Sequence, residues 1–107
     1  MTLDDGTATY EFSGKNADGK MIEIDVSHEG RIEEFEQEIS MDSVPGAVTN
    51  MLTKHLPKFK PTKAEKSTRE NFEVCYEFDG QGDDGQELDV EIRSDGKRIV
   101  IQDDASA

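Results

Sequence analysis

A phrase of eleven residues that returns without a gap constrains this chain more than any other feature. "YEFSGKNADGK" begins at Tyr10 and "YEFDGQGDDGQ" begins at Tyr76, 66 positions later. In both copies apolar and polar residues alternate with a period of two, an Asp-Gly pair supplies turn chemistry, and a second alternating run follows. The offset also pairs Gly30 with Gly96. The repeated unit is therefore predicted to be a three-stranded antiparallel meander.

The segment between the two copies has a different period. Its apolar residues follow the i, i+3, i+4 spacing of one helical face. These residues are Val44, Ala47, Val48, Met51, Leu52 and Leu56. We predict a helix over about residues 43–56, capped by Asp42 or Ser43, with Pro45 in its first turn. A basic stretch from Lys54 to Arg69, with six basic residues and one acid, begins at the end of this helix, and its part after Pro57, "KFKPTKAEKSTRE", is expected to form an irregular strand and then a turn.

These elements predict a single α+β domain over residues 1–107, with the order βββ-α-ββββ. One helix packs on an antiparallel sheet made of two repeated β-meanders, at about residues 8–39 and 72–102. Phe72, Val74, Tyr76 and Phe78 are expected on the inner face, and a β-bulge or a twist is expected between Ile32 and Phe35. One helix covers few strands. We therefore expect a second copy of the chain, or strong curvature of the sheet, to shield the rest of the apolar face.

The same order of motifs resembles the PepSY-like proteins, which are small exported bacterial domains with a β-lactamase-inhibitory-protein-like fold. The residues that carry the resemblance are the "DGK"-like turns, the helix start "SVPGAV", the Pro after the helix and the second "YE…DG…VEI…DGK" meander. The resemblance implies a helix on an antiparallel sheet, no enzymatic activity and a role in binding or inhibiting other proteins. It also implies a periplasmic or secreted location with an export signal removed, while the residues themselves leave a cytoplasmic location open. The chain departs from the family pattern because no helix precedes the first meander.

Charge limits the possible partners. The chain has 25 acidic and 12 basic residues, a formal charge of −13, so nucleic acid and anionic lipid surfaces are disfavoured. No apolar stretch reaches the roughly 18 residues of a membrane helix, so we expect no membrane insertion. Such a surface suits solubility, a salty environment or a cationic partner.

Residues that could support catalysis are few. The histidines are His28, in a predicted turn, and His55, near the end of the helix, and Cys75 lies on the strand face opposite Val74 and Tyr76. A lone Cys on a strand is typical of a small packing residue, and no nucleophile elbow, phosphate-binding loop or zinc-protease helix is present in the sequence. We predict that the protein is not an enzyme and needs no cofactor.

Calcium binding is an alternative. "DGQGDDG" places Asp79, Asp83 and Asp84 close together, and hard cations favour clustered oxygens on a loop. The spacing does not match an EF-hand, and the first copy has Ser13 where the second has Asp79. A plain hairpin turn is therefore the favoured interpretation, and these three residues are weak candidates for a metal site.

The outward positions of the meanders carry carboxylates, which are the candidate partner-binding residues. They are Glu11, Glu23, Asp25, Glu73, Glu77, Asp89 and Glu91. Like charges on neighbouring strands destabilise a sheet, so this face needs salt, cations or the basic stretch beside it. We predict a non-enzymatic bacterial envelope protein that binds a protein or peptide through its open sheet face. The alternatives are a divalent-cation module and a self-associating unit such as a homodimer.

Overall fold

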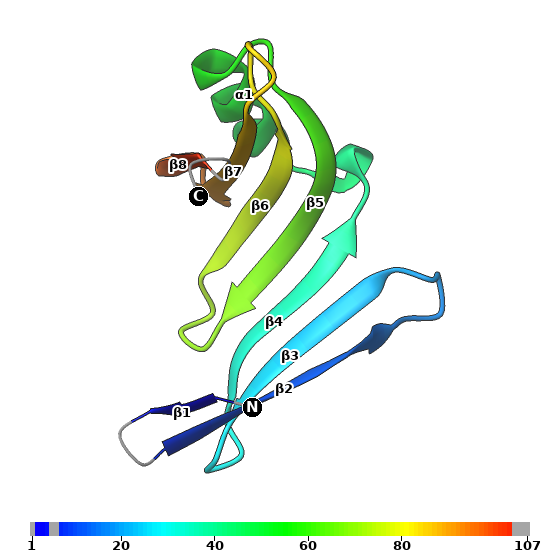
Figure 1. Ribbon diagram of the computed structural model, residues 1–107, viewed down its shortest axis with the longest axis vertical. Helices are drawn as coiled ribbons and strands as arrows, with labels where there is room; N and C mark the ends of the chain where they lie inside the picture. The colour runs from blue at the N-terminus through cyan, green and yellow to red at the C-terminus, as the bar shows by residue number, and fades with distance from the viewer. Residues whose placement is uncertain (1, 5–6, 104–107) are drawn as a thin grey trace.

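The chain forms one continuous antiparallel sheet with an α-helix packed on one of its faces (Figure 1). The computed structural model describes residues 2–4 and 7–103. The elements are β1 (Thr2–Asp4), β2 (Thr7–Lys15), β3 (Met21–Ser27), β4 (Ile32–Ile39), the 3-10 turn η1 (Met41–Ser43), α1 (Gly46–His55), β5 (Lys60–Arg69), β6 (Val74–Gln81), β7 (Glu87–Arg93) and β8 (Ile99–Asp103). Every strand pairs with its neighbours in chain order. The predicted order βββ-α-ββββ is confirmed by β2 to β8, and β1 adds a short strand at the edge.

The two meanders pair their strands in the same register. Each facing pair of β2 and β3 has a counterpart 66 positions later in β6 and β7: Tyr10–Val26 with Tyr76–Ile92, Phe12–Ile24 with Phe78–Val90, and Gly14–Ile22 with Gly80–Leu88. The four matched turn glycines all have φ between 73° and 86°, the left-handed conformation that glycine adopts without strain; they are Gly19, Gly30, Gly85 and Gly96. The duplication read from the sequence is therefore also a duplication of backbone geometry.

The predicted β-bulge is confirmed in β4. Val26 of β3 faces Ile32, whereas Asp25 faces Glu34, so Glu33 is an extra residue on β4. The bulge explains why Ile32 and Phe35 lie on the same face although their numbers differ by three.

The prediction for Phe72 is wrong. β6 begins at Val74, and Phe72 lies in the preceding turn with φ of 64° and 86% of its surface exposed. The turn is closed by the Phe72 N–H, which donates to the Arg69 carbonyl at 2.8 Å. The left-handed residue interrupts the alternation before the strand begins, so Phe72 does not share the inner face of Val74.

The start of the helix also differs from the prediction. Asp42 and Ser43 belong to η1, and Pro45 is the N-cap of α1 without any side-chain cap hydrogen bond. A residue before proline disfavours the helical conformation, and Val44 is accordingly extended, with ψ of 130°. Helical geometry can therefore begin no earlier than Pro45, and α1 in fact begins at Gly46, later than the apolar spacing alone suggests.

The hydrophobic core lies between α1 and the second meander. Val44, Val48 and Leu52 pack on the inner side chains of β5, β6 and β7, and the buried cluster also includes Ala64, Tyr76, Phe78, Leu88, Val90 and Ile92. Among the described residues of the first meander, only Ile39 packs against this cluster. Ala47, expected in the apolar stripe, is exposed.

Two glycines of the repeat have different surroundings. A Cβ on Gly80 would collide with the Lys60 carbonyl oxygen and would lie 2.8 Å from Phe59 Cζ. A Cβ on Gly14, its counterpart in the first meander, would meet nothing within 4 Å. The second meander thus needs a glycine where the first meander does not.

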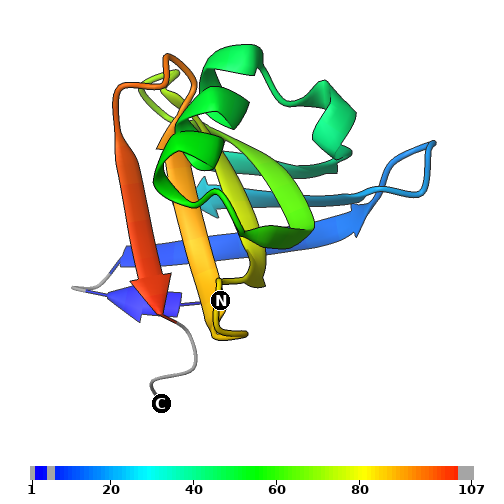
Figure 2. The same ribbon diagram turned by 90° about the horizontal axis from the view of Figure 1, so that it is seen from above.

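Sheet twist separates the two meanders in space. Figure 2 shows β2 running across the direction of β8, as expected when each strand turns by about 20–25° relative to its neighbour. In Figure 1, α1 lies near β7, at the opposite end of the sheet from β1 and β2. A helix of ten residues is about 15 Å long and cannot follow a twisted sheet of this width. None of the helices in the described residues has the length and apolar character required to cross a bilayer.

Candidate functional site

The face of the sheet opposite α1 is covered with carboxylates. Alternation sends every second side chain of β2 to β7 to this side, because the intervening residues form the apolar face. We call it the acidic face; its members are Glu11, Glu23, Asp25, Glu34, Glu36, Glu38, Glu65, Glu77, Asp79, Glu87, Asp89 and Glu91. The pairing register arranges them in rows that run across the strands.

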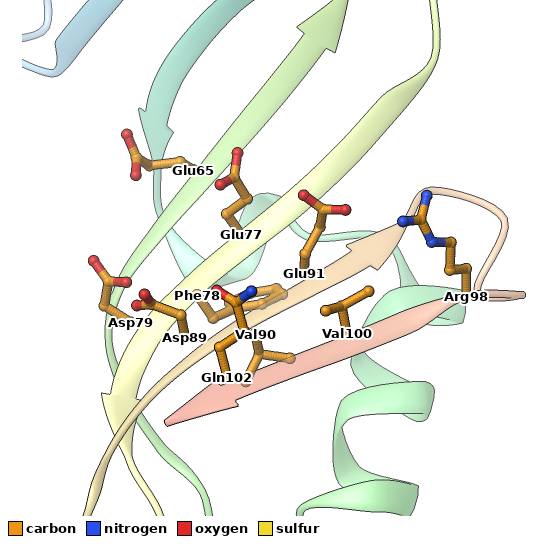
Figure 3. Close-up of a pocket in the computed structure, with 10 residues that line it drawn as sticks. All are labelled: Glu65, Glu77, Phe78, Asp79, Asp89, Val90, Glu91, Arg98, Val100 and Gln102. Carbon is orange, nitrogen blue, oxygen red and sulfur yellow. The ribbon is translucent and has the colours of Figure 1, made fainter. Parts of the chain in front are cut away.

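One of these rows consists of glutamates alone. Glu38 faces Glu65, Glu65 faces Glu77, and Glu77 faces Glu91, so four neighbouring strands place like charges directly opposite one another. We call these four residues the glutamate row. Figure 3 shows Glu65, Glu77 and Glu91 projecting side by side from successive strands, on the side of the sheet away from the helix. Each such pair destabilises the sheet, by about 0.2–1 kcal/mol on the scale of cross-strand pairs.

The crowding of carboxylates raises several pKa values. Burial, followed by repulsion from Glu77 and Glu34, raises the pKa of Glu36 from 4.5 to about 8. Burial, followed by the charges of Glu34 and Glu91, raises the pKa of Glu77 to about 6. For Glu23 a hydrogen bond with Glu11 is the largest cause and burial the second, and its pKa rises to about 7. Part of this face therefore holds protons near neutral pH.

Arg69 is the main positive charge within the acidic face. Its guanidinium donates to Glu91 Oε1 at 2.6 Å and to Glu73 Oε1 at 3.3 Å, and its pKa is raised, chiefly by the hydrogen bond to Glu91. Lys63 adds a weaker ion pair with Glu65 at 3.7 Å. The basic stretch thus neutralises part of the acidic face, as one interpretation of the sequence expected, because β5 lies between the two acidic meanders.

Two groups of three carboxylates are close enough to share a cation. The oxygen atoms of Glu11, Glu23 and Asp25 lie within 4.8 Å of one another, as do those of a second group formed by Glu34, Glu36 and Glu77. In each group one buried oxygen has no hydrogen-bond partner, namely Asp25 Oδ1 and Glu77 Oε2. Clustered oxygens of this kind suit hard cations such as Ca²⁺.

The weak metal candidates of the sequence do not form such a group. Asp83 makes an ion pair with Lys58 at 3.7 Å, and Asp84 Oδ1 accepts the Gln86 N–H at 3.4 Å. Asp79 lies on the acidic face, opposite Asp89. Within the described residues, the groups of three carboxylates whose oxygen atoms lie within 4.8 Å of one another are on strands β2 to β6 and include none of these three aspartates.

Two open grooves cross the acidic face. The first, of about 340 Å³, is lined by Glu65, Glu77 and Glu91 of the glutamate row together with Asp79, Asp89 and Arg98 (Figure 3). The second, of about 550 Å³, lies along Asp25, Glu34 and Arg69. Carboxylates form a large part of the lining of both grooves.

The predicted partner-binding residues fall into this arrangement. Glu11, Glu23 and Asp25 form one carboxylate group, while Glu77, Asp89 and Glu91 line the first groove. Glu73, just before β6, joins them through Arg69. Sequence reasoning missed Glu34, Glu36, Glu38 and Glu65. The alternation of "EFEQE" carried the signal for the first three, but the bulge at Glu33 obscured the parity of this strand.

The residues considered for nucleophilic catalysis lie in three different parts of the fold. Cys75 is 1% exposed, its Sγ donates to Glu73 Oε1 at 3.6 Å, and burial raises its pKa to about 11. A catalytic thiol needs the opposite shift. His28 lies in the exposed turn after β3, and His55 is exposed at the end of α1.

Comparison with known proteins adds no relative to this picture. A scan against protein-family models and a search of curated proteins both gave no match for the chain.

Proposed function

We propose that this protein is a non-enzymatic binding protein whose acidic face holds a basic, extended segment of another protein. The observation that carries the proposal is the glutamate row, in which four strands place like charges opposite one another. The fold does not require these charges, since outward positions of a sheet accept neutral polar residues such as Thr or Gln. A ligand with Lys or Arg side chains would relieve the repulsion on binding.

The geometry suits such a ligand. The 340 Å³ groove is open and lined by carboxylates at cross-strand spacing, and neighbouring strands lie about 4.7–4.9 Å apart. An extended peptide running across the strands would present a side chain to the same side about every 6.8 Å, close enough for each Lys or Arg to reach a carboxylate. The resemblance of the sequence to PepSY-like proteins supports the same role, and on that basis we propose a location in the bacterial envelope.

The test uses two variants of equal charge. The first changes the glutamate row, and the second changes three exposed loop acids; they are Glu38→Gln/Glu65→Gln/Glu77→Gln and Asp18→Asn/Asp42→Asn/Asp84→Asn. Binding of a labelled Lys-rich peptide is measured by fluorescence anisotropy at about 0.05 M salt and again at about 0.5 M salt. We expect the first variant to lose at least about tenfold in affinity and the second less than about twofold.

Both variants carry the same formal charge, so the comparison separates a defined site from attraction by net charge. Equal losses in the two variants would mean that net charge alone attracts the peptide, and the proposal would be wrong. A wild-type protein that shows no binding at low salt would also refute it.

Divalent-cation binding is a second candidate, favoured by the unpartnered oxygens in the two carboxylate groups. Titration calorimetry with calcium on the wild type, on Glu34→Gln/Glu77→Gln and on Asp83→Asn/Asp84→Asn decides it. Heat that disappears only in the first variant supports a site on the acidic face. No heat at millimolar calcium removes this candidate.

A further inference from the structure

The first meander leaves its apolar face open, although the same face of the second meander is covered by α1. Phe12 is 59% exposed and its counterpart Phe78 is 1% exposed; Tyr10 is 40% exposed and Tyr76 is 6% exposed. We call the inner side chains of β2 to β4 the uncovered face; they are Tyr10, Phe12, Ile22, Ile24, Val26, Ile32 and Phe35. In Figure 1 these strands extend away from the helix.

The contrast between the two copies is informative because their backbones have the same register. In the second copy the equivalent inner side chains form the hydrophobic core together with the apolar side chains of α1. The first copy presents the same kind of residue at the same positions, including two aromatic rings and three β-branched residues. Contiguous apolar patches of this kind on a folded domain mark places where another apolar surface docks.

The chain as a whole exposes more surface than a compact monomer of its size. The accessible surface of the chain is 7010 Å², whereas a compact monomer of 11.9 kDa exposes about 5,900 Å². The radius of gyration, 15.1 Å, is likewise larger than the roughly 13 Å of a compact domain of this length. The excess of about 1,100 Å² is comparable to the roughly 800 Å² that each partner contributes to a stable interface.

We infer that the uncovered face is the interface of a symmetric homodimer, in which the β2–β4 faces of two copies pack against each other. A two-fold axis places identical patches in contact, and two sheet faces pack about 10 Å apart. Charge favours this arrangement over other contacts between copies. The acidic face lies on the opposite side of the sheet, so face-to-face packing keeps the two sets of carboxylates apart although each chain carries −13.

The dimer is independent of the proposed binding function, because the two surfaces lie on opposite sides of the sheet. It leaves both acidic faces exposed and directed outward. A dimer could therefore bind two basic segments, one on each side.

Sedimentation equilibrium between about 5 and about 500 µM tests the inference. We expect a mass of twice 11.9 kDa at the upper concentrations. Phe12→Lys and, separately, Ile32→Lys are expected to weaken the dimer at least tenfold, since each places a charge in a desolvated contact. Both side chains are more than half exposed within one chain, so the monomer fold is expected to persist, and circular dichroism checks it.

The matched control is Phe72→Lys, which changes an exposed aromatic residue in the turn before β6, outside the uncovered face. We expect it to leave the dimer constant within about twofold. Raising the salt from about 0.05 to about 0.5 M is expected to maintain or strengthen the dimer, because salt screens the repulsion between two anionic chains.

Three results would overturn the inference. The first is a monomer at every concentration. The second is equal weakening by Phe72→Lys and Phe12→Lys. The third is a dimer that salt dissociates, since that behaviour would indicate docking of the basic stretch of one copy on the acidic face of another.

Discussion

Replacing Glu36 with glutamine is expected to stabilise the protein, and only above mildly acidic pH. The Glu36 carboxyl is repelled by nearby glutamates from three other strands, namely Glu23 on β3, Glu65 on β5 and Glu77 on β6, besides Glu34 on its own strand. Burial and these charges raise its pKa from 4.5 to about 8. The folded protein therefore binds the Glu36 proton more tightly than the unfolded chain does.

The sign of the effect follows from proton linkage. Between pH 4.5 and about 8 the folded state carries more of this proton than the unfolded state, so the free energy of unfolding decreases as the pH rises. A shift from 4.5 to about 8 corresponds to a ceiling of about 5 kcal/mol. Water and salt screen a partly exposed carboxylate, and we expect about 1–2 kcal/mol of this to be measurable.

Urea unfolding followed by circular dichroism, at several pH values from 4.5 to 8.5, measures the difference. The Glu36→Gln variant mimics the neutral carboxyl, so it is expected to match the wild type near pH 4.5 and to exceed its free energy of unfolding by about 1–2 kcal/mol near pH 8. Asp42→Asn, a change of the same charge at an exposed loop position, serves as the control and is expected to change stability by less than about 0.5 kcal/mol. A Glu36→Gln variant that is less stable than the wild type at pH 8, or an offset that does not depend on pH, would refute the reasoning.

Four further outcomes are expected from the packing. Gly80→Ala should lower the free energy of unfolding by about 2 kcal/mol or more through overpacking, whereas Gly14→Ala should change it by less than about 0.5 kcal/mol; urea unfolding of both variants checks this pair. Phe72→Gly should be more stable than Phe72→Ala by about 1 kcal/mol, because only the second keeps a Cβ at positive φ, and equal stabilities would contradict the assigned turn. Phe78→Ala should lower the free energy of unfolding by about 3–5 kcal/mol, and a loss below about 1 kcal/mol would argue against the core as described. Cys75 should react with a thiol reagent only on unfolding, since it is buried and its pKa is raised to about 11; rapid labelling of the native protein would contradict this.

The sequence was sufficient to predict strands β2 to β8, the helix α1 and their order. The gapless offset between Tyr10 and Tyr76 fixed two meanders of equal register, because apolar alternation and Asp-Gly turns are local signals that a strand and a hairpin follow closely. The bulge in β4 was also visible, since Ile32 and Phe35 could not otherwise share a face.

Details that depend on neighbours in space were not predictable. Counting by twos from Val74 places Phe72 on the inner face of β6, but Phe72 lies in the turn before this strand and has a positive φ, which directs its side chain elsewhere. The start of α1 is a different case, because the apolar spacing misplaced it although the local effect of Pro45 on Val44 can be read from the sequence.

The acidic face was predicted only in part for the same reason. Carboxylates at outward positions of the meanders were evident, but the glutamate row exists because β4 and β5 bring Glu38 and Glu65 into line with Glu77. Which strands become neighbours, and in what register, is a long-range property that one sequence does not state. The exposure of Phe12 is another such long-range property, since it depends on which part of the sheet the helix packs against.

The one-sided core has a consequence for local opening of the structure. The strands β6 and β7 contribute side chains to the buried cluster, so their amide hydrogens are expected to exchange with solvent only when the whole domain unfolds. The amide hydrogens of β2 and β3 are expected to exchange through local separation of these strands. Tyr10 and Tyr76 occupy equivalent positions in the two meanders, but α1 covers only the second meander. The ratio of their amide exchange rates in the monomeric Phe12→Lys variant therefore measures how much α1 contributes to the stability of the sheet. The first meander can thus serve as a reference, within the same chain, for the stability of the second meander.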